Sequence, residues 1–222
     1  MHLVIISGTP RAKKASNTHK IITQFRKGYE AGGNTAEVHY LAERSRWEGI
    51  REAYRENSRI LFALPLFVEC IPGILMEFLE TLEPCPAGEE KTLSFLVQGG
   101  FAEASQLRCC ESYLEKLPGY LNCQYGGTLI KGNMFGLALV PEKSAAKMSA
   151  PFLEMGSAFA RDGCFQKDKV TEFAKPEYFS KSFIRFFSLI TPFQDMMFRR
   201  AAKSMGCQRP LDDRPLEEHV VS

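Results

Sequence analysis

The sequence of 222 residues predicts an α/β protein in which helices cover both faces of a five-stranded parallel sheet. Two observations lead to this prediction. Apolar runs of strand length alternate five times with stretches of helical spacing between Leu3 and Arg161. The run 60–64 is also continuously apolar, which is typical of a strand buried on both faces of a parallel sheet.

The first two predicted strand–helix units depend on short local signals. The apolar run 3–6 is the first strand, and the alternating segment 36–41 is the second. The first helix runs from about 17 to 31, because Gly32-Gly33 ends it. The charged stretch 43–57 has apolar residues only at Trp47, Ile50 and Tyr54, which predicts a solvent-facing helix with a narrow buried stripe.

Prolines and glycines divide the rest of this framework. Pro72 is expected to be the first residue of a helix that reaches Leu82. The fourth strand is 92–97, a helix follows at about 103–117, and the fifth strand lies within 122–130. The last helix is expected between 142 and 161, where Pro151 either kinks it or begins a new turn.

Length, charge and cysteine content exclude several classes of protein. A chain of 222 residues fits one α/β domain with an appendage or two small domains. A formal charge of +2 without a basic stripe is not typical of a nucleic-acid binder. Seven cysteines contain no C-x-x-C pair, so no metal site is expected. Free thiols and a first strand close to the N-terminus favour a cytoplasmic protein without a signal peptide.

The segment 7–18 joins the first strand to the first helix and is rich in hydroxyl, amide and basic side chains. The first N–H groups of a helix have no intrahelical partner, and the helix dipole favours an anion there. This loop has neither the glycine spacing of a P-loop nor that of a dinucleotide fingerprint. We therefore expect it to hold a single phosphate monoester, although ordinary capping residues would look similar.

Two further loops follow predicted strands, at 65–73 and 98–103. In an open parallel sheet, ligands bind outside the carboxyl ends of the strands, where the strand order reverses. Because all three loops follow strand ends, we expect them to meet in one crevice.

These three loops resemble those of the flavodoxin-like NAD(P)H-dependent FMN reductase family over about residues 3–161. Ser7-Gly8-Thr9-Pro10-Arg11 and Ser16-Asn17-Thr18 resemble the family's phosphate loop. The segment 65–73 resembles its flavin loop, although Phe67 replaces the usual tyrosine and Cys70 a common serine. Gln98-Gly99-Gly100-Phe101 resembles the glycine turn beside the isoalloxazine ring.

The resemblance implies a flavodoxin-like doubly wound fold that binds FMN and takes NADPH or NADH as co-substrate. It implies that the phosphate is bound by Thr9, Arg11, Ser16, Asn17 and Thr18. It also implies that the ring is contacted by Pro65, Leu66, Phe67, Val68, Gly99, Gly100 and Phe101. The loop 65–68 would offer backbone N–H groups to the polar atoms of the ring. Hydride transfer requires no acid–base side chain, so no catalytic residue is nominated.

The function that this resemblance implies is electron transfer from NAD(P)H to a quinone, a free flavin or a similar small acceptor. Two alternatives stay open. One is an electron carrier of the flavodoxin type, although such carriers are strongly acidic and this chain is not. The other is a non-catalytic flavin-binding protein that recruits a partner through its C-terminal part.

The chain beyond the framework divides into a helical, aromatic-rich appendage at 166–205 and a loose polar tail at 206–222, after a flavodoxin-like domain at 1–165. Aromatic residues flanked by lysines and arginines crowd the segment 178–205. Such stripes are usually core or interface, so packing on its own domain or a homo-oligomer contact is favoured. The basic flanks leave a membrane-surface contact as the lesser alternative.

Overall fold

In this computed structural model the described residues are 1–189 and 191–213, of which 191–194 are described by their backbone alone. The chain forms two compact units, Met1–Tyr178 and Phe179–Ser222. The sequence-based boundary at 165 lies earlier than this one, because α7 (Lys167–Ala174) packs on β5 within the first unit.

The first unit contains a five-stranded, all-parallel sheet, as predicted, and its order β2-β1-β3-β4-β5 is that of the flavodoxin-like fold. The strands begin and end close to their predicted positions. They are β1 (His2–Ser7), β2 (Thr35–Tyr40), β3 (Arg59–Pro65), β4 (Thr92–Gln98) and β5 (Gln124–Lys131).

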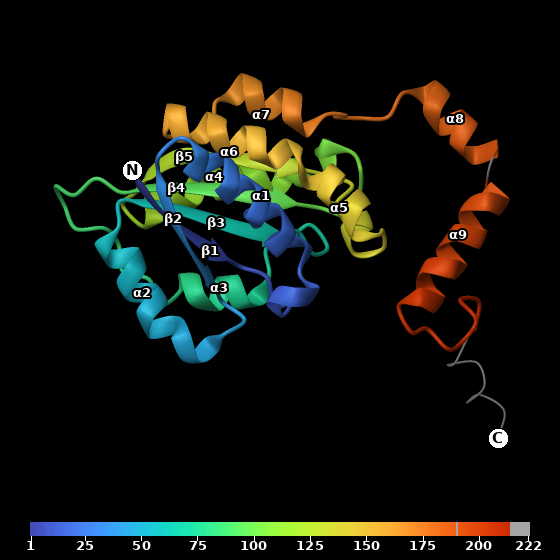
Figure 1. Cartoon of the computed structure of the whole chain (residues 1–222), viewed down its shortest axis with the longest axis horizontal. Helices are drawn as coiled ribbons and strands as arrows, with labels where there is room; N and C mark the ends of the chain where they lie inside the picture. The colour runs from blue at the N-terminus through green and yellow to red at the C-terminus, as the bar shows by residue number, and fades with distance from the viewer. Residues whose placement is uncertain (190, 214–222) are drawn as a thin grey trace. The chain divides into compact units, whose positions relative to one another are not determined.

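Helices cover both faces of this sheet, with α2 and α3 below it and α6 and α7 above it in Figure 1. One buried cluster joins the sheet to α2 (Trp47–Glu56), α3 (Gly73–Leu79) and α4 (Arg108–Tyr120). The other joins it to α1 (Asn17–Ala31), α5 (Glu142–Ser149), α6 (Pro151–Asp162) and α7. Successive side chains of β1 point to opposite faces of the sheet. Val4 and Ile6 therefore belong to the first cluster, and Leu3 and Ile5 belong to the second.

Several helix boundaries differ from the predicted ones, including that of α2, which begins at Trp47 and not at 43. Pro72 is the N-cap of α3 and not its first residue, and α3 ends at Leu79. The helix expected at 103–117 starts with the 3-10 turn η3 (Ala104–Leu107) before α4. Pro151 begins α6, so the helix expected at 142–161 is two helices. The remaining 3-10 turns are η1 (Lys13–Ala15), η2 (Arg44–Arg46) and η4 (Phe135–Ala138).

The second unit contains α8 (Lys181–Leu189) and α9 (Thr191–Ser204). No helix among the described residues has both the length and the apolar content needed to cross a bilayer. Most of the predicted tail, 214–222, lies outside the described residues. The seven cysteines are all free thiols.

Helices α1 and α6 approach each other so closely that glycine is required on both. A Cβ atom on Gly28 would lie 1.9 Å from the backbone oxygen of Leu153, and one on Gly156 would lie 2.0 Å from that of Phe25. The hydroxyl of Ser157 donates a hydrogen bond across the contact to the backbone oxygen of Gly28, at 3.1 Å. The position of α1 over the sheet therefore depends on backbone contact with α6.

We expect Gly28→Ala to lower the free energy of unfolding by about 3 kcal/mol or more, because the added methyl group must force the two helix backbones apart. Gly49→Ala in α2 is the matched control, since nothing lies within 4 Å of its added Cβ. That variant should be neutral or more stable by up to about 1 kcal/mol. Urea unfolding of both variants measures the difference, and an equal effect of the two substitutions would contradict the close contact.

Candidate functional site

The carboxyl ends of the three neighbouring strands β1, β3 and β4 bring the three predicted loops to one edge of the sheet. Ser7 lies opposite both Tyr40 and Ala63, and Gln98 lies opposite both Pro65 and Lys131. Backbone hydrogen bonds continue past the strand ends, from Gly8 N to the Ala63 oxygen (2.8 Å) and from Leu66 N to the Gln98 oxygen (2.8 Å). The strand order reverses between β1 and β3, which is where ligands bind in sheets of this kind.

The N-terminus of α1 presents unpaired donors at this edge. Ser16 is the N-cap, and its Oγ accepts a hydrogen bond from the backbone N–H of His19 at 3.2 Å. The backbone N–H groups of Asn17 and Thr18 have no acceptor among the described residues. Because α1 is fifteen residues long and begins at Asn17, these two groups also lie at the positive end of a helix dipole. The arrangement suits an anion.

Buried polar atoms without partners lie beside that helix end. Ser7 Oγ and Asn17 Oδ1 are buried and make no hydrogen bond within the part of the chain described. Thr9, Ser16 and Thr18 are buried as well. An unpaired buried polar atom costs about 1–3 kcal/mol, so two of them at one place favour a site that a polar ligand completes.

Positive charge at the loop comes from basic side chains and not from the nearby histidine. Arg11 and Lys14 are exposed, and the ammonium group of Lys13 lies 5.1 Å from the centre of the Tyr40 ring. His19 Nδ1 and the Tyr40 hydroxyl are hydrogen-bonded at 2.7 Å. Burial, and then the charge of Lys13, lowers the pKa of His19, so its imidazole is neutral at pH 7.

The loop after β3 forms a tight turn with strained backbone. Phe67 and Cys70 exchange two backbone hydrogen bonds of 3.0 Å, and the two residues between them have positive φ, 48° at Val68 and 61° at Glu69. A β-branched residue rarely adopts this conformation, and Val68 is fully exposed, so packing of its side chain does not explain it. Strain of this kind concentrates at functional sites.

The donors of this turn differ from the predicted ones. The N–H of Leu66 is bonded to the Gln98 oxygen and that of Phe67 to the Cys70 oxygen, so neither is available to a ligand. The N–H groups of Val68 and Glu69 have no acceptor among the described residues. Of the loop 65–68, therefore, only Val68 keeps a backbone donor, while Pro65 is buried at the end of β3.

The two glycines after β4 serve different purposes. Gly99 donates to the Lys131 oxygen (3.0 Å) and accepts from Met134 N (2.9 Å), and an added Cβ would lie 3.4 Å from Leu107. Packing within the protein thus explains Gly99. Gly100 is exposed, and its added Cβ would make only an ordinary contact with Phe135, at 3.6 Å. Gly100 is therefore the glycine with an open side.

The loop after β5 belongs to this edge, and the sequence did not indicate it. The Asn17 amide donates to the Met134 oxygen (3.0 Å), and Lys20 Nζ to the Leu137 oxygen (2.8 Å), which ties this loop to the start of α1. A Cβ on Gly132 would lie 2.4 Å from the Phe101 oxygen. Gly132, immediately after the fifth strand, is the residue from which the sequence could have indicated that this loop belongs to the site.

Exposed aromatic side chains follow three neighbouring strands at this edge. Phe67 lies after β3, Phe101 after β4 and Phe135 after β5, and Phe101 is 75% exposed. Aromatic side chains left in water at the end of a sheet indicate a surface for an apolar or aromatic group. The candidate site therefore combines backbone donors at the start of α1, which have no acceptor among the described residues, with exposed aromatic side chains after β3, β4 and β5.

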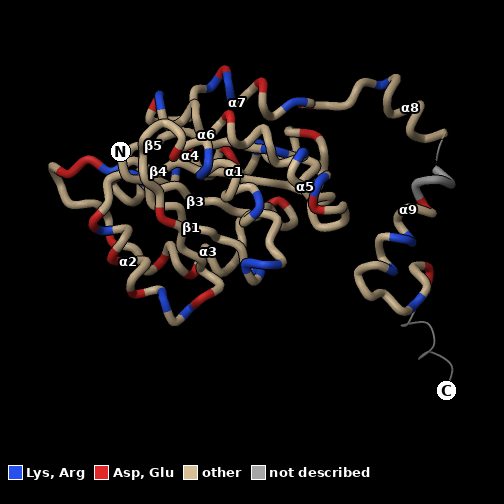
Figure 2. Tube along the Cα trace, viewed as in Figure 1, with Lys and Arg blue, Asp and Glu red and all other residues tan. Residues whose placement is uncertain are grey.

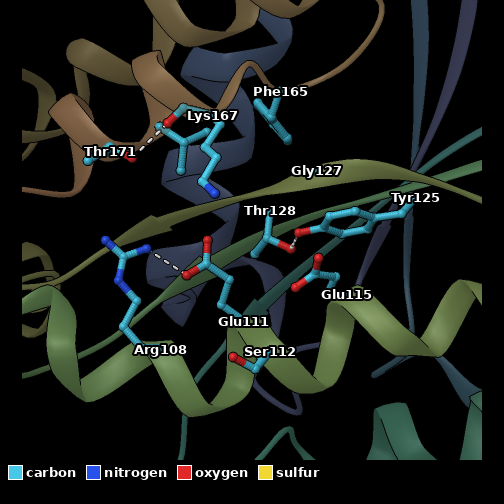
Figure 3. Close-up of a pocket in the computed structure, with 11 residues that line it drawn as sticks. Arg108, Glu111, Ser112, Glu115, Tyr125, Gly127, Thr128, Phe165, Lys167 and Thr171 are labelled. Carbon is cyan, nitrogen blue, oxygen red and sulfur yellow. Dashed lines mark hydrogen bonds and ion pairs between the residues drawn. The ribbon is translucent and has the colours of Figure 1, made fainter.

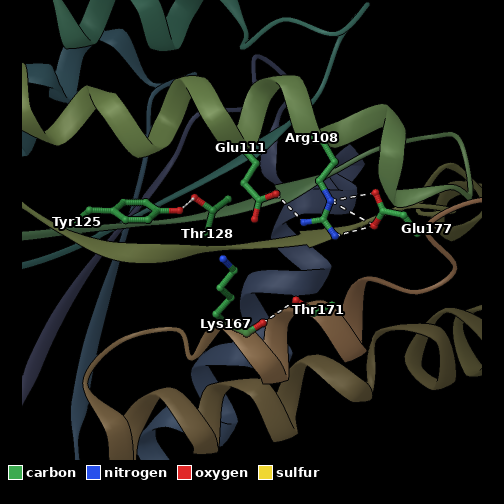
Figure 4. Close-up of polar contacts among 7 residues, drawn as sticks. All are labelled: Arg108, Glu111, Tyr125, Thr128, Lys167, Thr171 and Glu177. Atoms are coloured by element: carbon green, nitrogen blue, oxygen red, sulfur yellow. Dashed lines mark hydrogen bonds and ion pairs between the residues drawn. The ribbon is translucent and has the colours of Figure 1, made fainter.

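A cavity of about 270 Å³ lies elsewhere, between α4, β5 and α7, and contains none of the predicted site residues (Figure 3). On its rim, Arg108 pairs with Glu111 (2.6 Å) and with Glu177 (2.7 Å), as Figure 4 shows. The hydrogen bonds from Arg108 lower the pKa of Glu177. These ion pairs tie the chain after α7 to α4, which is a structural role.

The structure is an α/β protein whose first strand–helix turn has free backbone donors and lies at the same sheet edge as exposed aromatic side chains, and known structures share its fold. An NAD(P)H:quinone oxidoreductase from Methanothermobacter marburgensis matches with a TM-score of 0.54 and 16% identity, over 73% of this chain and 98% of that chain. An FMN-dependent NADH-azoreductase from Bacillus anthracis, in complex with FMN, matches with a TM-score of 0.53 and 13% identity, over 72% and 99%.

The general stress protein 14 from Treponema denticola, also in complex with FMN, gives a TM-score of 0.53 and 13% identity, over 72% of this chain and 97% of that chain. These structures confirm the predicted flavodoxin-like fold. Neither a scan of protein-family models nor a search of curated proteins gives a match to the sequence.

We expect Val68→Gly to raise the free energy of unfolding by about 0.5–1 kcal/mol. Glycine adopts positive φ without the roughly 1–2 kcal/mol cost of an L-residue, and this gain exceeds the entropy that it adds to the unfolded chain. Lys116→Gly in α4 is the control, because glycine inside an exposed helix should cost about 1 kcal/mol. Urea unfolding without added ligand measures the free energy of unfolding of both variants. A destabilised Val68→Gly variant would show that the turn is not strained.

Proposed function

We propose that this protein is an FMN-dependent oxidoreductase that passes electrons from NADH or NADPH to a small acceptor such as a quinone or free flavin. The observation that carries the proposal is at the start of α1 and the end of β1: the backbone N–H groups of Asn17 and Thr18 have no acceptor among the described residues, and the Ser7 hydroxyl is buried there without a partner. Flavodoxin-like neighbours that hold FMN support the choice of cofactor.

The residues at this edge fit a phosphate monoester. The N–H groups of Asn17 and Thr18 would donate to its oxygens, and the Ser7 hydroxyl would gain the acceptor that it lacks in the protein. Arg11 would add a charge-assisted hydrogen bond. The hydroxyls of Thr9 and Ser16 accept from the backbone at Arg11 and His19 and still have a proton to donate.

The other loops fit a flat ring. Phe67 and Phe101 would cover its apolar surface and exclude water, and Val68 would offer its unpaired N–H to a polar atom at the ring edge. Gly100 leaves the space that a ring approaching the backbone needs. FMN, when bound, supplies hydride acceptance and electron transfer, while the protein positions it and limits water access.

Arg11→Ala should raise the dissociation constant for FMN about tenfold, because one charge-assisted contact to the phosphate is lost. The double variant with Ser16→Ala would also remove the N-cap of α1, so the single variant is the cleaner test. Titration of FMN fluorescence against the apoprotein measures the affinity. Arg46→Ala is the control, an exposed arginine outside the site that should leave the affinity unchanged.

Turnover tests the activity itself. With FMN bound, the protein should oxidise NADPH or NADH continuously when a quinone or free flavin is present, and the rate should depend on acceptor concentration. Bound FMN without oxidation of either nicotinamide would identify an electron carrier instead. Failure to bind FMN at all would overturn the proposed function.

A further inference from the structure

Helices α8 and α9 of the second unit expose large apolar side chains to water. Phe186 in α8 is 61% exposed and Phe198 in α9 is 71% exposed. They belong to a larger exposed set on these helices that contains Phe183, Ile184, Phe187, Leu189, Met196 and Met197. A set of this size on two short helices indicates a surface that another body covers.

In α8, Lys181 and Arg185 lie on the side of the helix opposite Phe183 and Phe187. The rings of Phe179, Phe183 and Phe187 follow at four-residue intervals, with centres 4.5 and 5.1 Å apart, and so share one face. Lys181 and Arg185 stand two residues away from these positions, about half a turn round the helix. Helix α9 has the same character, since Arg199 and Lys203 share one face and Met197 and Ala201 another.

The charge of this segment indicates what kind of surface covers its exposed apolar side chains. Residues 181–205 contain five lysines and arginines and one aspartate, which gives this segment a formal charge of +4. Because the formal charge of the whole chain is +2, that of the remaining residues is −2. Arg199 pairs with Asp195 and Asp212, whereas Lys181, Arg185, Arg200 and Lys203 form no ion pair with a described residue. Figure 2 marks these basic residues in blue. The exposed apolar side chains thus share these two helices with four cations that have no ion-pair partner among the described residues.

We propose that residues 179–205 bind the surface of a bilayer that contains anionic lipids. A short helix with aromatic residues on one face and lysine or arginine on the other lies in the plane of such a surface. Helices of nine and fourteen residues are too short to span it. Two copies of α8 packed together would hold four cations and no acid, while anionic headgroups give every cation a partner.

Vesicle co-sedimentation of the full chain tests this proposal. Wild-type protein should bind vesicles of phosphatidylcholine with about 30% phosphatidylglycerol, and bind pure phosphatidylcholine at least about tenfold more weakly, because each cation near an anionic surface contributes about fivefold in affinity. Raising the salt from about 0.05 to 0.5 M should weaken the binding, because it shortens the Debye length severalfold.

Two double variants separate the contributions. Lys181→Glu with Arg185→Glu should weaken binding to the anionic vesicles at least about 25-fold, and Phe186→Ser with Phe198→Ser about tenfold. Matched controls lie in the first unit, at exposed positions. Lys143→Glu with Lys147→Glu in α5, and Tyr120→Ser in α4, should bind as the wild type does.

Three outcomes would overturn the proposal. The wild type binds neither kind of vesicle, or it binds both equally, or the second-unit variants bind no more weakly than the controls. Sedimentation equilibrium identifies the rival, since a dimer that Phe186→Ser with Phe198→Ser dissociates would mean that a second copy covers this surface. None of these readouts requires FMN or turnover, so they stand apart from the proposed function.

Discussion

The close contact between α1 and α6 is the constraint on which the candidate site depends. Because Gly28 and Gly156 lack a Cβ, the two backbones come near enough for Ser157 to bond across them. That contact holds the far end of α1, while Ser16 caps the near end and Asn17 and Lys20 fasten it to the loop after β5. A helix N-terminus can bind an anion well only if its donors are held still, and here both ends of α1 are held.

The same edge of the sheet has both polar and apolar features that are unfavourable in the free protein. At β1 it leaves polar atoms buried and unpaired, and at β3 it holds Val68 and Glu69 in a strained turn. Beyond these, aromatic side chains remain in water. Each feature alone is unfavourable for the free protein. Together they are complementary to a ligand with an anionic end and a flat aromatic end, which is why FMN is the cofactor that the geometry supports best.

The two units differ in what stabilises them. The first buries two clusters on the faces of its sheet, whereas the described helices of the second keep most of their large apolar side chains exposed. Arg108, bonded to Glu177 just before the boundary, holds the end of the first unit in place. The described part of the second unit therefore buries little apolar surface, as the proposed contact with a bilayer requires.

Local patterns determined much of this protein from the sequence alone. Continuous apolar runs predicted the parallel strands, and the turn after 3–6 predicted a helix start with free N–H groups, which the structure shows at Asn17 and Thr18. Strand burial and unpaired helix donors are properties of short segments. Tertiary structure decided which donors remain free. The N–H of Leu66 bonds to the oxygen of Gln98 at the end of β4, and that of Phe67 bonds within a turn, so neither is free. Helix α7 belongs to the first unit because it packs on β5. Such outcomes depend on partners distant in the chain, and a linear sequence does not state which of them will meet.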